Sequence, residues 1–211
     1  LKKSGAALLS LIDEILDFSS LEAGRFQLAS APLNLRALAE EAIAILGPRA
    51  REKGLALSLR MEDPLPAALL GDGGRLRQIL VNLLDNAVKF TERGAVSLTV
   101  RCQAEDARWI ALDLEVTDTG VGIAEIDAAR IFESFTQIDA KRDSQLGSTG
   151  LGLAICRQLV RLMDGEIELE SRLGAGSIFR VRLRLEKTEC AITAAASVDT
   201  AREATTEDGQ P

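Results

Sequence analysis

The segment from Gln78 to Thr91 constrains the fold more than any other part of the chain. Its apolar residues recur at helical spacing and form one continuous stripe: Ile79, Leu80, Leu83, Leu84, Ala87 and Val88. On another side of the same helix, Asn82, Asn86 and Lys89 line up. A carboxamide oxygen suits Mg²⁺ and a lysine ammonium suits phosphate. For this segment alone, a solvated face with two tolerated asparagines is the simpler interpretation.

Composition bounds what the chain can do. The 211 residues are 46% hydrophobic and 27% charged, which predicts a globular protein. No apolar run approaches the ~18 residues of a membrane helix, and the net charge of −7 disfavours general nucleic-acid binding. The chain contains no histidine, so it has no imidazole base, ligand or phosphoacceptor. Three scattered cysteines without a CxxC motif disfavour a metal site and indicate a reducing, cytoplasmic location.

An apolar helix is predicted at the start of the chain, from residue 1 to about residue 18. Its apolar residues follow heptad-like spacing and cover more surface than a lone helix can expose to water. This surface predicts a partner, either another helix or a second copy of the chain. A helix packed on its own domain remains an alternative. Gly24 is expected to end the helix.

A second helix is predicted after an extended linker. Pro32 disfavours helix in residues 29–34, and Asn34 is a suitable N-cap. The helix is expected to run toward Lys53, with Pro48 either kinking it or beginning a new segment.

The remaining elements follow from alternation and turn residues. Asp72 is expected to cap the central helix after a loop at 64–74. A further helix is predicted at 150–163, ended by Gly165, and the chain from about 189 onward has no periodicity, as in a linker or a disordered tail. Five strands are predicted, at 55–59, 95–102, 109–116, 166–170 and 177–185, with the second and third forming an antiparallel hairpin and the last two flanking a turn at 174–176.

Two glycine clusters follow the central helix. In DTGVGI (118–123), an aspartate at a strand end precedes two glycines that allow backbone to approach a ligand closely. In GSTGLGL (147–153), glycines open a helix whose N-terminal amides can receive phosphate. No GxxxxGK motif is present, so neither cluster is a P-loop, and Ile155 occupies the third glycine position of a dinucleotide fingerprint.

The order of these motifs closely resembles the ATP-binding domain of sensor histidine kinases, which belongs with gyrase, Hsp90 and MutL. The resemblance covers roughly 160 residues. ILDFSSLEAG (15–24) resembles the end of the second dimerisation helix, and IFESFTQID (131–139) resembles hybrid kinases. The four matching boxes are Asn82 to Asn86, Asp118-x-Gly120-x-Gly122, Phe132 to Phe135, and Gly150-x-Gly152.

The resemblance implies the Bergerat ATP fold, an α/β (α+β) two-layer sandwich. A mixed, mostly antiparallel sheet would carry helices on one face, preceded by a helix of a dimerisation hairpin. The implied division is a partial hairpin at 1–23, a linker at 24–33, the ATP-binding domain at 34–187 and a tail or linker at 188–211.

Roles at the phosphate end are carried over position by position. Asn86 matches the Mg²⁺ ligand, and Lys89 matches a phosphate-contacting cation. Asn82 matches the position where gyrase and Hsp90 relatives hold a catalytic Glu. Because an amide cannot take a proton from water, we hypothesise phosphoryl transfer by Asn82 and Lys89 rather than rapid hydrolysis. Amides of Thr149, Gly150, Leu151 and Gly152 would receive the phosphates.

The purine end is implied in the same way. Asp118 matches the adenine anchor, which accepts a hydrogen bond from the exocyclic amine. Gly120 and Gly122 would let backbone approach the purine, with Ile123 on its face. Ser177 matches a hydroxyl near the adenine. Phe90 is either a second wall or a core residue.

Residues 124–149 would form a lid over the bound nucleotide. Phe132 and Phe135 would dock this lid, and Lys141 or Arg142 would reach the γ-phosphate. Hybrid kinases often have a glycine where this chain has Ser148, and the lost glycine is expected to stiffen the loop without abolishing binding.

The implied partners are ATP, a phosphoacceptor-His helix, a receiver domain and a second copy bound through the N-terminal helix. With no histidine present, the resemblance implies a fragment of a kinase, which is cytoplasmic or the cytoplasmic part of a membrane-bound sensor. A natural short protein is the alternative. Two other functions remain open: a non-catalytic, nucleotide-gated interaction module, and a kinase acting on a protein serine, which the dimerisation-like helix disfavours.

Overall fold

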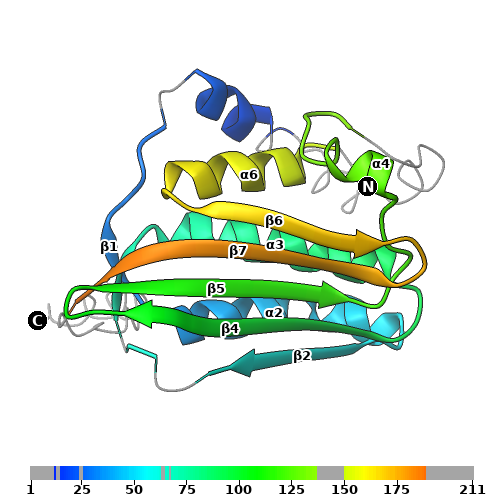
Figure 1. Ribbon diagram of the computed structural model, residues 1–211, viewed down its shortest axis with the longest axis horizontal. Helices are drawn as coiled ribbons and strands as arrows, with labels where there is room; N and C mark the ends of the chain where they lie inside the picture. Colours follow the sequence, from blue (N-terminus) through cyan, green and yellow to red (C-terminus); the bar gives the residue numbers. More distant parts are fainter. Residues whose placement is uncertain are drawn as a thin grey trace, which may run out of the picture.

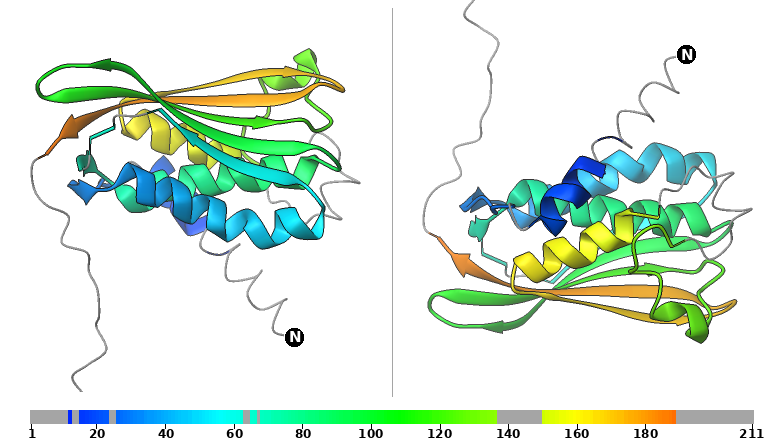
Figure 2. Two further views of the ribbon diagram at one scale, coloured as in Figure 1. Left: turned by 90° about the horizontal axis from the view of Figure 1, so that it is seen from below. Right: turned by 90° about the horizontal axis from the view of Figure 1, so that it is seen from above.

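The computed structural model shows one sheet covered by helices on one face (Figure 1, Figure 2). The described residues are 12, 15–23, 26–62, 65–66, 68–136 and 150–188. The strands are β1 (Ala31–Leu33), β2 (Ala56–Met61), β3 (Leu69–Gly71), β4 (Ala95–Glu105), β5 (Trp109–Asp118), β6 (Glu166–Arg172) and β7 (Gly176–Lys187). Among the described residues, the helices are α2 (Leu35–Glu52), α3 (Gly73–Phe90), α4 (Glu125–Ala128) and α6 (Gly152–Leu162), together with the described part of the N-terminal helix.

The sheet has seven strands in the order β1-β3-β7-β5-β4-β2, with β6 pairing to β7. The pair β2–β4 is parallel because the chain returns through α3 before entering β4, and the other pairs are antiparallel. All five predicted strands are present, whereas β1 and β3 were not predicted. The prediction of a two-layer sandwich with a mixed, mostly antiparallel sheet is confirmed.

Helix α3 forms the centre of the core, as its apolar stripe predicts. The Asp72 side chain caps the helix by accepting from the Arg75 N–H at 3.0 Å. Asn82 and Asn86 lie at the margin of the buried face and are half-buried. All six residues of the predicted stripe are buried: Ile79, Leu80, Leu83, Leu84, Ala87 and Val88.

Strand β5 divides the molecule into an apolar and a polar side. Its even-numbered residues face the helices, and Ile110, Leu112, Leu114 and Val116 are buried there. Asp118 continues the same phase as the last residue of the strand. Its carboxylate therefore ends on the helix side of the sheet, beside the apolar core.

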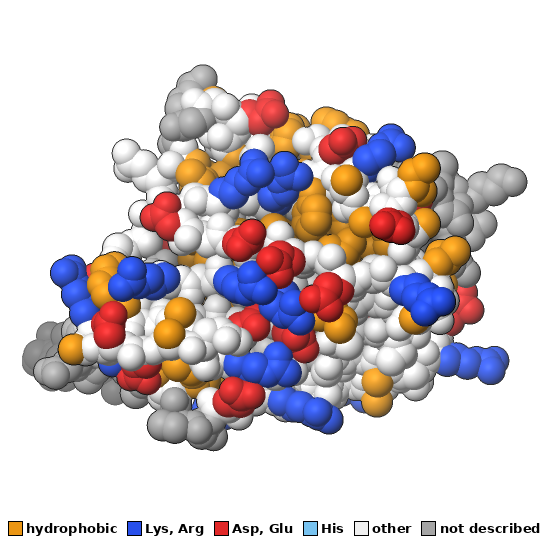
Figure 3. All heavy atoms as spheres, in the orientation of Figure 1, with side chains coloured by type: hydrophobic (Ala, Val, Ile, Leu, Met, Phe, Trp, Pro, Cys, Tyr) orange, Lys and Arg blue, Asp and Glu red, His pale blue; other side chains and the backbone are white. Residues whose placement is uncertain are grey.

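The opposite face of the sheet carries alternating acidic and basic side chains (Figure 3). Arg180 lies among them, donating to Glu170 at 2.8 Å and to Glu115 at 3.1 Å. Because opposite charges pair with each other along neighbouring strands, this face presents no block of one sign.

Helix α2 begins where predicted and continues through its proline. The Ala37 N–H donates to Asn34 Oδ1 at 3.0 Å, so Asn34 is the N-cap. Pro48 lies inside a single helical segment that ends at Glu52. The structure therefore shows one helix rather than two.

The segment before α2 is extended, as Pro32 indicates, but part of it joins the sheet. Residues 31–33 form β1, which pairs with β3. The predicted boundary between a linker at 24–33 and a domain at 34–187 stays a prediction. The sheet itself begins at residue 31, inside the predicted linker.

The described part of the N-terminal helix has one packed side and one exposed side. Asp17 accepts from Arg75 at 2.8 Å and from Gln78 at 2.9 Å, so the helix is held against the start of α3. On another side, Ile12, Ile15 and Leu16 stay exposed. The described part of the helix therefore packs on its own domain, and the partner that its apolar surface predicts stays a prediction.

The end of α6 differs from the prediction in one detail. Asp164, not Gly165, adopts the left-handed conformation after the helix, with φ of 53°. Gly165 is required for a different reason, since a Cβ there would lie 2.5 Å from the carbonyl oxygen of Arg182. The helix also begins at Gly152 rather than at Gly150.

Several predictions lie outside the described residues. These concern residues 1–11, Gly24, the lid residues 137–149 with Lys141, Arg142 and Thr149, and the tail from 189 to 211. Among the residues that the structure does describe, no helix has the length and hydropathy needed to cross a bilayer.

Candidate functional site

Asn82 connects α3 to the beginning of α6. Its Nδ2 donates to the Gly152 carbonyl oxygen at 3.4 Å. Asn86 lies one helical turn further along α3 and is half-buried. Of the two predicted asparagines, Asn82 therefore contacts the glycine-rich opening of α6.

The opening of α6 can attract an anion. Gly150 has φ of +72°, and a Cβ there would lie 2.9 Å from the backbone carbon of Phe135. Leu151 occupies the N-cap position, and its apolar side chain cannot accept from the first-turn amides. The positive end of the α6 dipole therefore lies at this opening, without a side-chain cap.

Lys89 takes a more enclosed position than a phosphate contact needs. Its side chain is buried, and Nζ lies 5.1 Å from the centroid of the Phe90 ring. The predicted roles of Lys89 at the phosphate and of Phe90 as a wall therefore stay predictions.

Asp118 is a buried carboxylate that receives donors from two sides. It accepts from the Gly120 N–H at 2.7 Å and from Ser177, which is its partner in the β5–β7 register. Burial raises the pKa of the Asp118 carboxyl, and the hydrogen bonds from Gly120 and Ser177 oppose part of that rise. An acceptor held in this way fits a ligand that brings a hydrogen-bond donor.

The loop after Asp118 is packed so closely that it requires both of its glycines. A Cβ on Gly120 would lie 2.5 Å from the Phe90 carbonyl oxygen. Gly122 has φ of +66°, and a Cβ there would overlap the Arg172 carbonyl oxygen. The glycines were predicted to admit a ligand, and the structure shows that they also admit neighbouring backbone.

Hydrogen bonds hold the same loop between α3 and the β6–β7 hairpin. The Val121 N–H donates to Phe90 at 3.4 Å, and the Val121 carbonyl accepts from Gly174 at 2.7 Å. The Ile123 N–H donates to Ser171 Oγ at 2.8 Å. Ser171 was missed by sequence reasoning, although a hairpin turning at 174–176 would have placed it opposite Ser177.

The two predicted lid anchors differ in their surroundings. Phe132 packs edge-on against Phe179, with ring centroids 6.2 Å apart. Phe135 is exposed, has φ of 62°, and makes an edge contact of 6.1 Å with Phe18 of the N-terminal helix. A bulky residue with positive φ is strained, and the N–H of Phe135 is held by the Gly150 carbonyl at 3.0 Å.

Lys53 caps the C-terminal end of α3, which sequence reasoning did not foresee. Its Nζ donates to the carbonyls of Val88 at 2.7 Å, Lys89 at 2.8 Å and Thr91 at 2.9 Å. These are carbonyls that a helix end leaves without a partner, and the ammonium also lies at the negative end of the helix dipole. Lys53 therefore fixes the end of α3 against which the loop at 118–123 packs.

Replacing Lys53 by methionine is expected to lower the free energy of unfolding by about 1–2 kcal/mol, because three carbonyls lose a charged donor. Urea denaturation of the variant would measure the loss. Arg51→Met is the matched control, since Arg51 is an exposed cation near the end of α2, two residues before Lys53. This substitution should cost less than about 0.5 kcal/mol. Equal losses in the two variants would contradict the capping role.

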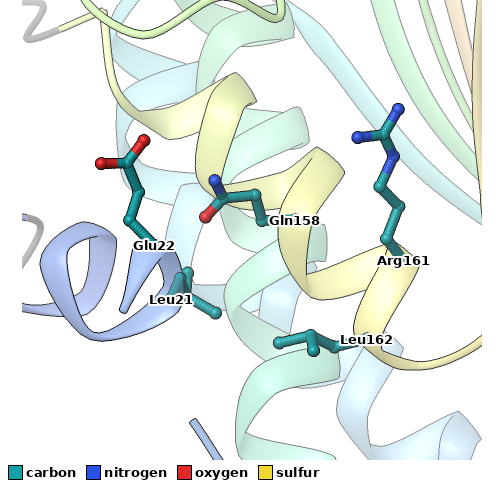
Figure 4. Close-up of a pocket in the computed structure, with 5 residues that line it drawn as sticks. All are labelled: Leu21, Glu22, Gln158, Arg161 and Leu162. Atoms are coloured by element: carbon teal, nitrogen blue, oxygen red, sulfur yellow. The ribbon is translucent and has the colours of Figure 1, made fainter. Parts of the chain in front are cut away.

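A groove lies between the N-terminal helix and α6 (Figure 4), and it is separate from the candidate nucleotide-site residues. It is lined by Leu21, Glu22, Gln158, Arg161 and Leu162. None of these is a predicted nucleotide-site residue. The groove instead marks the contact between the N-terminal helix and the rest of the fold.

The described residues thus form a site with two ends along α3. One end joins Asn82 to Gly152, and the other places Phe90 against Gly120 beside Asp118. Asn82 and Phe90 are separated by a helical rise of about 12 Å, which is comparable with the length of an extended nucleoside triphosphate. An anion-attracting end and a buried acceptor end suit a ligand with phosphates and a base.

Comparison with known families agrees with this geometry. Residues 71–187 match the family described as histidine kinase-, DNA gyrase B-, and HSP90-like ATPase. The chain belongs to this family. The matched range covers α3, the loop after β5, α6 and both strands of the β6–β7 hairpin, so every described residue of the candidate nucleotide site lies within it.

Two proteins with similar sequences are histidine kinases. The chain is 42% identical to the sensor histidine kinase GacS of Pseudomonas protegens over 89% of its own length and 20% of that protein. It is 39% identical to the signal transduction histidine-protein kinase BarA of Escherichia coli, over 88% of this chain and 20% of that protein. The chain therefore spans about a fifth of the length of these relatives.

A solved structure shares the fold as well as the sequence. The full-length ShkA crystal structure in complex with AMPPNP superimposes with a TM-score of 0.77 and is 39% identical, covering 88% of this chain and 37% of that one.

Proposed function

We propose that this chain is the catalytic, ATP-binding part of a two-component sensor histidine kinase, which transfers the γ-phosphate of ATP to a histidine. The observation that carries the proposal is the two-ended site. Asp118 is buried as an acceptor at one end, and Asn82 contacts the first residue of α6 at the other. The similarity to GacS and BarA supports the same function.

The residues present fit ATP together with Mg²⁺. The purine amine would donate to Asp118, with Ile123 and the backbone at Gly120 and Gly122 beside the base. The amides around Gly152 would receive phosphate oxygens. Within the described part of the chain, no group of three or more acidic or cysteine residues could hold a metal by itself. Mg²⁺ would therefore be held by Asn86 and the phosphates together, where it neutralises phosphate charge.

The side chains at the phosphate end favour transfer over hydrolysis. Asn82 offers an amide that already donates to Gly152 and cannot remove a proton from water. Lys89 and the α6 amides would supply charge stabilisation while the acceptor group is brought in line. Catalysis would thus consist of positioning and charge neutralisation.

The acceptor histidine would come from a dimerisation hairpin, because this sequence contains no histidine. The exposed surface at Ile12, Ile15 and Leu16 fits an apolar helix of such a hairpin, or the second protomer of a dimer. A receiver domain would then accept the phosphate, and the site would operate in the cytoplasm. These partners and this location are proposals.

Binding of ATP with and without Mg²⁺ tests the site. In calorimetric titrations, Mg²⁺ is expected to raise the ATP affinity of the wild-type chain, and Asn86→Ala is expected to lose about tenfold of that gain. Gln103→Ala is the matched control, since Gln103 is an exposed amide on the outer face of the sheet. An unchanged Mg²⁺ dependence in Asn86→Ala would refute the proposed metal role.

Transfer of phosphate tests the reaction. The chain would be mixed with a separately supplied hairpin that carries a phosphoacceptor histidine, and with ATP labelled in the γ-phosphate. Labelled hairpin is the expected result. Saturable ATP binding without labelling would favour the alternative function, a nucleotide-gated interaction module.

A further inference from the structure

A buried thiol lies against the asparagine that joins α3 to α6. Cys156 and Ile79 have no exposed surface, and the Cys156 thiol donates to the Ile79 carbonyl oxygen at 3.8 Å. The Asn82 side chain forms a hydrogen bond with the same thiol and a second one with the Gly152 carbonyl oxygen, which lies 3.4 Å from Nδ2. Gly152 and Cys156 are one helical turn apart on α6, so both can face the same side of α3.

The direction of these hydrogen bonds follows from the two carbonyl groups, which can only accept. Burial raises the pKa of the Cys156 thiol to about 12, so its proton stays on sulfur at neutral pH. That proton is directed to Ile79, and the sulfur is therefore an acceptor toward Asn82. The Gly152 carbonyl likewise requires the nitrogen of the Asn82 carboxamide. Nδ2 thus donates to two acceptors on α6, and Oδ1 lies on the other branch of the carboxamide.

The hydrogen bond between Asn82 and Gly152 is weak by itself. Its length of 3.4 Å exceeds the usual length of about 3.0 Å. If the carboxamide turned over, Oδ1 would take the place of Nδ2 and lie against the Gly152 carbonyl and the Cys156 sulfur. Because both of these groups are acceptors toward Asn82, the sulfur adds to the preference for a single orientation.

We propose that Cys156 is a positioning residue that holds the Asn82 carboxamide with Oδ1 directed to the phosphate end of the site. This inference rests on the proposed function, because it assigns the orientation of Asn82 toward bound ATP. An amide oxygen repels phosphate oxygens and attracts a cation or an N–H group. The partner of Oδ1 would therefore be Mg²⁺ or the N–H of the acceptor imidazole, and not the triphosphate itself.

Hydrogen exchange of the Asn82 side-chain amide tests the orientation without any nucleotide. The exchange would be followed by NMR on the isotopically labelled full chain, and the signal would be assigned by its absence in Asn82→Ala. Cys156→Val is expected to speed this exchange about tenfold, because an acceptor is lost while the side chain keeps a similar volume. Cys156→Ser keeps a donor and an acceptor and should stay within about threefold of the wild type. Cys102→Val is the matched control, since Cys102 is a thiol on β4.

Transfer of phosphate to the supplied hairpin tests the consequence for the reaction. Cys156→Val is expected to lower the transfer rate about tenfold. Its affinity for ATP without Mg²⁺ should change by less than about twofold, because Oδ1 does not contact the triphosphate. Adding Cys156→Val to Asn82→Ala should cause no further loss of rate, since Cys156 acts through Asn82. A loss of affinity for ATP with Mg²⁺ would identify Mg²⁺ as the partner of Oδ1, and an unchanged affinity would identify the imidazole.

The outcomes separate this inference from the proposed function. Unchanged amide exchange in Cys156→Val, or losses of rate that add in the double variant, would overturn the role of Cys156 and leave the nucleotide site in place. Failure of the wild-type chain to bind ATP would overturn the proposed function, and with it the role of Cys156 toward bound ATP. If thermal unfolding shows that Cys156→Val is not folded, Cys156→Ala takes its place, because it also removes the acceptor.

Discussion

Replacing Asp118 by asparagine is expected to weaken ATP binding about a hundredfold, because the purine amine loses a charged acceptor. The amide can offer only one oxygen, and the Gly120 and Ser177 N–H groups already compete for it. Calorimetric titration with ATP would measure the change. Asp113→Asn is the matched control, since Asp113 is also buried on β5 but faces the outer side of the sheet.

The same substitution should also change the free energy of unfolding, and the size of this change should depend on the pH. Burial raises the folded-state pKa of Asp118 above its unfolded value. Between these two values, the folded chain binds more protons than the unfolded chain, so ionisation of Asp118 costs stability as the pH increases. Below the ordinary aspartate range of about pH 4, that cost is absent.

The difference in unfolding free energy between Asp118→Asn and the wild type should therefore become more favourable to the variant from acid to neutral pH. Urea denaturation at several pH values would measure it. A difference that stays constant with pH would contradict a raised pKa at Asp118. Retained ATP affinity in the variant would contradict its role as the adenine anchor.

Replacing Gly176 by alanine is expected to cost roughly 3 kcal/mol of unfolding free energy. Gly176 has φ of +87°, and a Cβ there would overlap the Asp118 carbonyl oxygen. The added methyl group must therefore push β5 and β7 apart at the strand end that carries both Asp118 and Ser177. ATP binding should be lost together with stability, because the acceptor moves with its strand.

Gly174→Ala provides a close control for this prediction. Gly174 lies in the same turn with φ of +81°, but a Cβ there meets no atom within 4 Å. Only the backbone conformation is then unfavourable, at about 1 kcal/mol. Thermal or urea unfolding of both variants would separate the two effects. Similar losses at Gly174 and Gly176 would show that the conformation, not the close approach to β5, determines the cost.

Much of the fold follows from local patterns in the sequence. The apolar stripe of α3, the caps at Asn34 and Asp72, and the alternation along β5 all depend on residues that are near one another in the chain. Such patterns report which side of an element is buried, because a helix and a strand repeat with fixed periods. They do not report which strand pairs with which, so β1 and β3 were missed.

The resemblance to a kinase domain placed the candidate site residues in order, and the structure shows Gly152 and Gly120 beside α3. Phe135 shows the limit of that approach. Its box position was identified, but its positive φ and its contact with Phe18 depend on how the N-terminal helix packs. A motif predicts the role of a residue, whereas the conformation of that residue depends on neighbours far away in the chain.

The sequence by itself determined the family and the central helix and named the candidate nucleotide-site residues, because each is encoded in a short run of residue types. Only the tertiary structure decided what orients those residues. Lys53 reaches Val88 across 35 positions of sequence, and Ser171 reaches Ile123 across 48. Such contacts depend on strand register and helix packing, which arise from the whole core rather than from any local pattern.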